Sequence, residues 1–212
     1  MPDFPTAINN IIFDLDGTLW DPMEMSVRAW HKALNGFNCI KDPIPKEAIQ
    51  GIMGMQHDLV GKKLFPYLSA QEQHEVMNSC YVQEVNDIKE SGGVLYHGLE
   101  DTLKVLEGKY DLYIVSNCQA GYIEAFYEYH GLSNYFKDFE CSGNTGLSKT
   151  QNINMLIERN AVDKPVYVGD TQGDYTAAME NHIPFIFAEY GFGEVPNASH
   201  TISNITKLTD IL

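Results

Sequence analysis

The sequence predicts an α/β protein, with a doubly wound parallel sheet and an inserted helical domain. Short apolar runs alternate with stretches of helical length, and this alternation is typical of a parallel sheet with crossover helices. A long segment early in the chain breaks the alternation and carries only helical patterns. The first observation predicts a layered core, and the second predicts the inserted domain.

Four short apolar runs are the predicted strands. They are rich in Ile, Val, Phe and Tyr, and polar or turn residues follow each of them. Continuous apolar runs suit parallel strands whose two faces are both covered by helices. The four runs span residues 11–13, 112–115, 166–168 and 183–188.

Stretches with helical patterns accompany the later strands. A parallel sheet needs such stretches, because consecutive parallel strands are joined by a crossover that is usually a helix. The predicted helices cover residues 99–107, 120–130, 150–160 and 171–181.

The segment between the first and second predicted strands is too long for a simple crossover. A crossover needs about a dozen residues and one helix, whereas this segment runs from residue 20 to residue 91. Within it Trp30, Ala33 and Leu34 recur at helical spacing. We therefore expect a helical cap domain at residues 20–91 and a core formed by residues 1–19 and 92–212.

The charge and the cysteines argue against several classes of protein. Twenty-nine acidic against fourteen basic residues give a formal net charge of −15. Nucleic acid is then an unsuitable partner, because phosphate backbones are bound through clustered Lys and Arg. The four cysteines form no C-x-x-C pair, so zinc and thioredoxin-like motifs lack support. With no visible signal peptide or membrane-spanning run, we expect a cytoplasmic protein that does not bind a membrane.

The strongest chemical signal is the motif Asp-Leu-Asp-Gly-Thr, which places Asp14 and Asp16 directly after the first predicted strand. Ligands of open α/β sheets bind at the carboxyl ends of strands. Residues two apart on an extended chain point the same way, so both carboxylates can reach one pocket. A plain turn is an alternative interpretation. A calcium loop is not, because Thr18 and Leu19 occupy its fifth and sixth positions.

Two further acids follow the strand predicted at residues 166–168. Asp170 lies at the carboxyl end of that strand, and Asp174 is one helical turn later, where it can face the same site. An Asp N-cap on the next helix is the alternative, and it explains one acid better than both. Four carboxylates at one edge repel one another without a cation, and hard oxygen ligands select Mg²⁺ over zinc. We therefore expect Mg²⁺ as the cofactor.

Three weaker signals come from Ser116, Asn117 and Lys149. The hydroxyl of Ser116 and the amide of Asn117 can donate hydrogen bonds to a phosphate, although such residues also cap helices. Lys149 precedes a predicted helix and can bring an ammonium into the site, although an exposed lysine is the commoner case there. A Walker A loop does not fit, because Ser148 stands where that motif requires Gly.

A late pair of glycines, Gly191 and Gly193, suggests a dinucleotide site. Such a site requires a third glycine, and position 196 is a proline. The sequence therefore gives little support for a dinucleotide cofactor.

The order of these signals along the chain resembles that of the haloacid dehalogenase superfamily of phosphatases, in particular its phosphoglycolate phosphatase and β-phosphoglucomutase-like subgroup. The acid motifs at residues 14–18 and 169–174 carry the resemblance as a pair, whereas Ser116 and Lys149 are identified by position. The resemblance covers nearly the whole chain and implies a Rossmann-like core with a helical cap of the C1 type. The superfamily's dehalogenases lack the second Asp of the first motif, so Asp16 points to phosphoryl transfer.

The resemblance also implies a role for each candidate residue. Asp14 is the expected nucleophile, and Asp16 is the expected general acid and base. Lys149 is expected to stabilise the transferring phosphoryl group and to orient Asp14, while Ser116 binds that group with Asn117 beside it. The expected metal ligands are Asp14, Asp170 and the backbone carbonyl of Asp16, with Asp174 supporting the metal site.

The expected function is therefore Mg²⁺-dependent hydrolysis of a small phosphomonoester, through an aspartyl phosphate on Asp14. Phosphoglycolate or a sugar phosphate is the expected substrate, and the assembly is a monomer or homodimer. Residues 51–57 form the candidate specificity loop, and Lys62 and Lys63 can meet an anionic substrate or remain solvated. The alternatives are a sugar-phosphate phosphomutase, a phosphonate hydrolase and an inactive binding protein.

Overall fold

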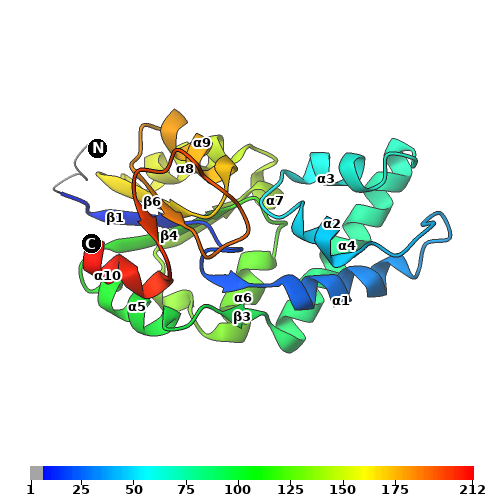
Figure 1. The fold of residues 1–212 in the computed structure, drawn as a ribbon, viewed down its shortest axis with the longest axis horizontal. Helices are drawn as coiled ribbons and strands as arrows, with labels where there is room; N and C mark the ends of the chain where they lie inside the picture. Colours follow the sequence, from blue (N-terminus) through cyan, green and yellow to red (C-terminus); the bar gives the residue numbers. More distant parts are fainter. Residues whose placement is uncertain (1–6) are drawn as a thin grey trace.

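A six-stranded parallel sheet, in the order β5-β4-β1-β6-β7-β8, forms the centre of the molecule (Figure 1). The structure is a computed structural model that describes residues 7–212, apart from the side chains of His57 and Asp58. The predicted α/β class with a parallel sheet is confirmed. The strands are β1 (Asn10–Phe13), β4 (Asp111–Ser116), β5 (Asp138–Cys141), β6 (Pro165–Gly169), β7 (Phe185–Ala188) and β8 (Thr201–Ile202).

Strand β1 is fully buried and pairs with β4 on one side and β6 on the other. Phe13 is level with Ile114 of β4 and with Val168 of β6. The backbone N–H of Asp14 extends this pairing by donating to the carbonyl of Val168 at 2.8 Å. The segments that follow β1, β4 and β6 therefore meet at one edge of the sheet.

Side chains of the central strands alternate between two apolar cores. Ile11 and Phe13 belong to the core shared with α5 and α6, whereas Ile12 belongs to the core shared with α8 and α9. This alternation follows from the period of two along a strand. Helices thus cover both faces, which is the doubly wound arrangement (Figure 1). The helices around the sheet are α5 (Leu99–Glu107), α6 (Tyr122–His130), α7 (Ser142–Thr145), α8 (Lys149–Asn160), α9 (Gln172–Glu180) and α10 (Leu208–Ile211).

Two strands of the sheet are absent from the sequence-based prediction, and both lie at its edges. β8 has only two residues. β5 carries Asp138 and Glu140, which Arg159 of α8 pairs at 2.8 Å each. An edge strand with charged residues has no continuous apolar run, so the pattern that identified the central strands misses it.

Some boundaries differ from those predicted. β7 begins at Phe185 rather than at residue 183, because Pro184 has no N–H to donate to the ladder. α6 begins at Tyr122 rather than at residue 120, directly after Gly121 in a left-handed conformation. α8 begins at Lys149, where Ser148 forms a capping box with Gln151.

Part of the chain between β1 and β4 forms a helical insert, defined here as α1 to α4, at one end of the sheet (Figure 1). It leaves through β2 (Trp20–Asp21) and returns through β3 (Val94–Leu95), which pair as an antiparallel ribbon. β2 is a short strand within a segment where the sequence predicts none. The long helix α4 packs against α1 and also against α6 beside the sheet. The insert helices are α1 (Met23–Leu34), α2 (Lys46–Gln50), α3 (His57–Leu64) and α4 (Ala70–Ser91).

Buried side chains of the insert and of one sheet face form one continuous apolar cluster. Trp30 of α1 and Val76 of α4 belong to the same cluster as Phe13 of β1. The proposed division into a core and a cap domain at residues 20–91 therefore stays a prediction. Among residues 7–212, no helix combines the length and the apolar character that crossing a membrane requires.

Candidate active site

Three carboxylates from two strand ends meet at the edge of the sheet. Asp14 follows β1, Asp170 follows β6, and Asp174 lies in the first turn of α9. One carboxylate oxygen of each lies within 4.8 Å of those of the other two, and all three side chains are buried. The register of β1 and β6 explains why residues more than 150 positions apart converge here.

Lys149 places a buried ammonium against these acids. Its Nζ lies 2.8 Å from Oδ1 of Asp14 and also donates to Oδ1 of Asp174. Only 5% of the residue is exposed, which rules out the alternative of a solvated lysine at a helix start. The capping box at Ser148 fixes the first turn of α8, from which this side chain points to the acids.

The acids repel one another in a buried setting. Burial, followed by the charge of Asp174, raises the pKa of Asp14 to about 7, although Lys149 opposes the shift. Burial and the charges of Asp174 and Asp14 raise the pKa of Asp170 to about 8. Burial alone would lower the pKa of Lys149, but the two nearby carboxylates raise it well above its usual range. Three carboxylates with one ammonium leave excess negative charge, which suits a divalent cation.

The loop after β7 fixes the carboxylate of Asp170. The backbone N–H of Phe192 donates to its Oδ2 at 2.8 Å, and the hydroxyl of Thr18 donates to its Oδ1 at 3.2 Å. Gly191 lies so close that a Cβ there would be 2.3 Å from the Cβ of Asp170. The glycines at 191 and 193 thus serve a close approach of backbone to Asp170. In the sequence these glycines suggested only an incomplete dinucleotide motif, and nothing near them indicated a contact with Asp170.

The sequence left open that an Asp of the second acid motif caps the next helix. The structure has an N-cap there, but it is a Thr. The N-cap of α9 is Thr171, whose side chain accepts from the N–H of Asp174. Oδ2 of Asp174 accepts from the N–H of Thr171 at 2.9 Å, which completes a capping box. Asp170 is not the cap and is free to serve the acid cluster.

The side chain of Asp16 lies beside the cluster rather than within it. Its Oδ1 accepts from the indole Nε1 of Trp20 at 2.7 Å and from the hydroxyl of Tyr122 at 3.0 Å. Burial raises its pKa to about 7, these two hydrogen bonds oppose the shift, and Glu84 of α4 adds to it. Nothing in the local sequence around Tyr122 or Glu84 signals that these residues approach Asp16.

Ser116 and Asn117 are at the end of β4, as expected, and neither caps α6, whose N-cap is Gly121. Ser116 is buried, and its Oγ accepts from the N–H of Cys118 at 3.4 Å. Nδ2 of Asn117 donates to the carbonyl of Gly54 at 2.7 Å, so this amide links the sheet edge to the insert. The role of both residues in phosphate binding stays a prediction.

The candidate specificity loop reaches the same edge of the sheet. A Cβ at Gly54 would meet Cγ2 of Thr171 at 3.2 Å, so the loop packs directly on the second acid motif. Lys63 donates to the carbonyl of Gly51 at 2.7 Å and thereby holds the loop. The side chain of His57, at the end of this loop, lies outside the described residues.

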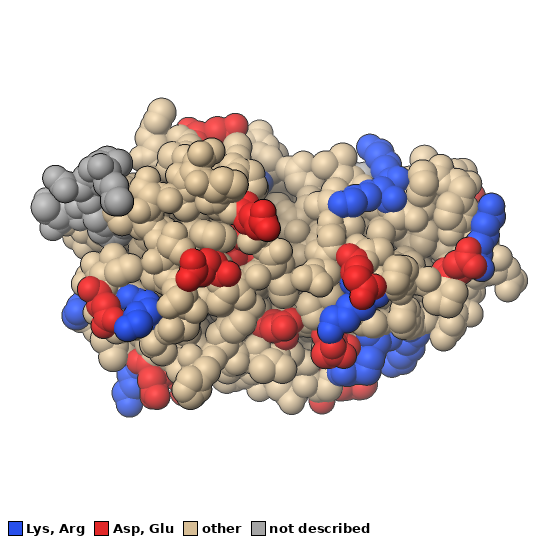
Figure 2. Space-filling model, in the orientation of Figure 1, with Lys and Arg blue, Asp and Glu red and all other residues tan. Residues whose placement is uncertain are grey.

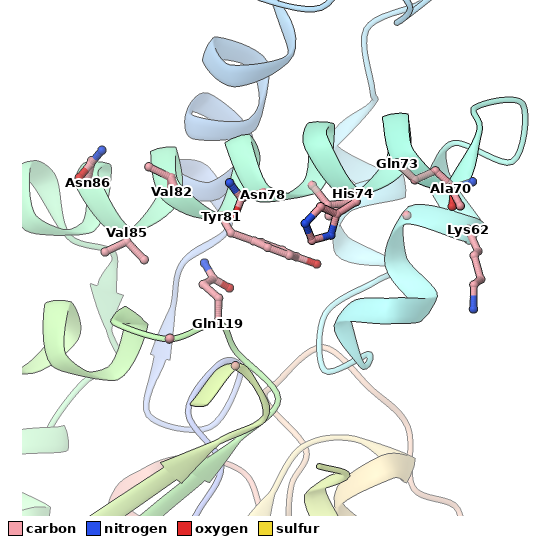
Figure 3. A pocket seen from close by; sticks show the side chains of 14 residues that line it. Lys62, Ala70, Gln73, His74, Asn78, Tyr81, Val82, Val85, Asn86 and Gln119 are labelled. Atoms are coloured by element: carbon pink, nitrogen blue, oxygen red, sulfur yellow. The ribbon is translucent and has the colours of Figure 1, made fainter. Parts of the chain in front are cut away.

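A cavity of about 720 Å³ lies between the insert and the segments after β4 and β5 (Figure 3). In Figure 3, Tyr81 and His74 project from α4 into this space, and Gln119 reaches it from the opposite side. Lys62 lines the cavity, whereas none of the three clustered acids does. Gln119 also donates to Oε2 of the buried Glu84 at 2.8 Å, which joins α4 to the loop after β4.

The comparisons with known proteins agree with this geometry. Residues 11–188 match the family model described as haloacid dehalogenase-like hydrolase. A phosphoglycolate phosphatase of Photobacterium profundum is 24% identical, over 97% of this chain and 96% of its own length. One of Vibrio vulnificus is 25% identical over the same shares. The solved structure of a haloacid dehalogenase-like family hydrolase from Streptococcus pneumoniae has a TM-score of 0.84, at 21% identity, and covers 98% of this chain and 99% of its own.

The expectation of a phosphatase-type enzyme from this superfamily is thereby confirmed. The matched region extends from β1 to β7 and includes the insert and all of the clustered acids. The chain belongs to the haloacid dehalogenase-like hydrolase family.

Proposed function

We propose that this protein hydrolyses a small phosphate monoester with Mg²⁺ as cofactor and Asp14 as nucleophile. One observation carries the proposal: the buried acids Asp14, Asp170 and Asp174 cluster together, and the ammonium of Lys149 contacts two of them, Asp14 at 2.8 Å and Asp174. Such a site combines a carboxylate that can attack phosphorus with positive charge for the phosphoryl oxygens.

The donor set fits Mg²⁺, because it offers several hard oxygen ligands in a buried pocket of excess negative charge. The side chains of Asp14 and Asp170 and the backbone carbonyl of Asp16 would hold the ion, with Asp174 in support. The ion would supply positive charge for the phosphoryl oxygens. Metal binding by these residues would also compensate the repulsion between three acids that are buried together.

Three side chains have separate roles in the proposed reaction. Asp14 forms a bond to phosphorus while the ester bond breaks, and Asp16 gives its proton to the departing oxygen. Lys149 faces the negative charge that develops on the phosphoryl group. Asp16 then removes a proton from water, and this water hydrolyses the aspartyl phosphate.

Phosphoglycolate or a sugar phosphate is the proposed substrate. The support comes from the two relatives named phosphoglycolate phosphatase and from Lys62, which can meet an anionic group in the cavity under α4. We place the enzyme in the cytoplasm as a monomer or homodimer; its four cysteines are free, as a reducing compartment requires.

The test is phosphate release from 2-phosphoglycolate and a panel of sugar phosphates, measured with Mg²⁺ and with EDTA. Asp14→Asn should lower kcat by at least about a thousandfold, because an amide is a poor nucleophile. The exposed Asp101→Asn is the matched control and should keep wild-type activity.

An Asp14→Asn variant with substantial activity would refute the assignment of the nucleophile. Isomerisation of β-glucose 1-phosphate without phosphate release would instead indicate a phosphomutase. Borohydride trapping of a lysine adduct would indicate phosphonate cleavage, and inactivity on every ester would leave the binding-protein alternative.

A further inference from the structure

Two hydrogen bonds hold the side chain of Asp16 by the same oxygen. The indole Nε1 of Trp20 donates to Oδ1 at 2.7 Å, and the hydroxyl of Tyr122 donates to Oδ1 at 3.0 Å. In the described part of the chain, no hydrogen bond ends on Oδ2 of Asp16. The two oxygens of this carboxyl group are therefore in different surroundings.

Both donors are buried and closely packed. Trp20 and Tyr122 are at most 2% exposed and pack edge to face, with ring centroids 5.9 Å apart. Trp20 also packs against Phe126 at 5.0 Å. A Cβ at Gly93 would lie 2.8 Å from the Trp20 ring, so the residue before β3 also packs closely on this ring. This packing fixes where the two donors meet Asp16.

A tight turn brings Trp20 back to Asp16. Gly17, with φ of 82°, donates its N–H to the carbonyl of Trp20 at 2.9 Å, and residues 16 and 20 form an isolated bridge. Trp20 is also the first residue of β2, through which the chain enters the insert. The orientation of Asp16 is thus tied to the base of the insert.

The asymmetry has a chemical consequence for the neutral acid. An oxygen that accepts two hydrogen bonds is stabilised as the carbonyl oxygen, so the proton resides on the other one. After the proton has left, both hydrogen bonds remain on Oδ1, so Oδ2 is the oxygen left to take a proton back.

We propose that Trp20 and Tyr122 are positioning residues that fix Oδ1 of Asp16 and thereby make Oδ2 the oxygen that carries the catalytic proton. The proposal rests on the function proposed above. In the first half-reaction the Oδ2–H bond breaks, and its proton passes to the ester oxygen as the P–O bond breaks and Asp14 bonds to phosphorus. In the second half-reaction a proton from water returns to Oδ2.

Such a role predicts an effect that depends on the leaving group. An alkoxide is a strong base and needs the proton as it departs, whereas 4-nitrophenolate is a weak base and leaves without it. The quantity to compare is kcat/KM, because it includes the steps up to departure of the leaving group and excludes hydrolysis of the aspartyl phosphate.

The experiment measures kcat/KM of Tyr122→Phe with benzyl phosphate and with 4-nitrophenyl phosphate, two aromatic esters of similar size. The variant removes one hydroxyl and keeps the buried ring. The ratio of benzyl to nitrophenyl kcat/KM should fall at least about tenfold below the wild-type ratio, a part of the 10²–10⁴ that general acid catalysis contributes. Tyr110→Phe is the matched control, because its hydroxyl donates to the Leu212 carbonyl far from the site, and its ratio should not change.

Trp20→Phe removes the second donor and should lower the same ratio, and thermal unfolding of each variant reports whether it is folded. An unchanged ratio in folded Tyr122→Phe would overturn the inference, since a purely structural defect reduces both substrates alike. Failure of the function proposed above is a separate result: the wild type would then release no phosphate from either ester.

Discussion

At position 149 the fold buries a lysine whose charge is matched by two carboxylates. Its Nζ contacts both Asp14 and Asp174, and its side chain is only 6% exposed. A buried charge of this kind is stable only while its partners remain. The same ion pairs hold Asp14 in place, so the lysine links local stability to the position of the proposed nucleophile.

Replacing this lysine should destabilise the metal-free protein. Lys149→Met leaves Asp14 and Asp174 without a counter-charge, and the free energy of unfolding should fall by about 3 kcal/mol. Urea unfolding in EDTA measures this. The control is Lys207→Met, because the Lys207–Asp210 pair is more than half exposed and should contribute little. If the free energy of unfolding falls no more in Lys149→Met than in this control, the ion pairs of Lys149 do not stabilise the fold, which would contradict the prediction.

At the scale of elements, the contact between α4 and the loop after β4 joins the insert to the sheet. Glu84 is buried on α4 and accepts from Nε2 of Gln119 at 2.8 Å. Burial raises the pKa of Glu84 above its ordinary value of 4.5, although the hydrogen bond from Gln119 opposes the shift. The folded protein therefore binds a proton here more tightly than the unfolded chain does.

The raised pKa of Glu84 makes the folded protein less stable as the pH rises. Stabilisation from protonated Glu84 is complete below pH 4.5 and is lost as the pH rises through the raised pKa of the folded state. Glu84→Gln cannot ionise, so its free energy of unfolding should fall less than that of the wild type between about pH 4 and pH 8. Urea unfolding across this range checks the prediction. Parallel pH profiles of the two proteins would show that Glu84 is not responsible.

The central elements could be predicted from the sequence because they satisfy simple rules. β1, β4 and β6 are buried on both faces and appear as apolar runs, and Asp14 and Asp170 directly follow two of them. β5 does not appear, because Asp138 and Glu140 interrupt any apolar run, and the Arg159 of α8 that pairs with them lies about twenty positions further along the chain. Ion pairs between distant segments leave no periodic signal in the local sequence.

Only part of the candidate site could be predicted from the sequence. Residues at strand ends, such as Asp14 and Ser116, could be inferred from the edge of the sheet alone. Tyr122 and Phe192 could not, because their contacts with Asp16 and Asp170 depend on how α6 and the loop after β7 fold over the edge. The sequence therefore indicates the acids but not the groups that orient them.

At the scale of the molecule, the protein carries a large negative charge, and three of its acidic side chains are buried together at the sheet edge. The net charge is −15, and on the face shown in Figure 2 basic side chains lie among acidic ones, mostly over the insert. The clustered acids lie within the fold, where repulsion between them acts on the stability of the whole chain.

Mg²⁺ should therefore stabilise the folded protein, because a ligand that binds only the native state raises its stability by mass action. Protons compete with the cation for Asp14 and Asp170, whose pKa values lie at about 7 and about 8. The rise in Tm on adding Mg²⁺ should thus be larger at pH 8 than at pH 6. Thermal unfolding with Mg²⁺, or with KCl at equal ionic strength, tests this; an equal rise with KCl would contradict a specific site.

The central claim is that Asp14 carries the phosphoryl group during turnover. The most direct measurement is peptide mass spectrometry of the Mg²⁺-loaded enzyme after rapid acid quench during turnover of 4-nitrophenyl phosphate. The peptide that contains Asp14 should gain the mass of one phosphoryl group at that residue, and Asp14→Asn should gain none. A phosphoryl group on any other residue, or nitrophenol release by Asp14→Asn at the wild-type rate, would contradict the claim.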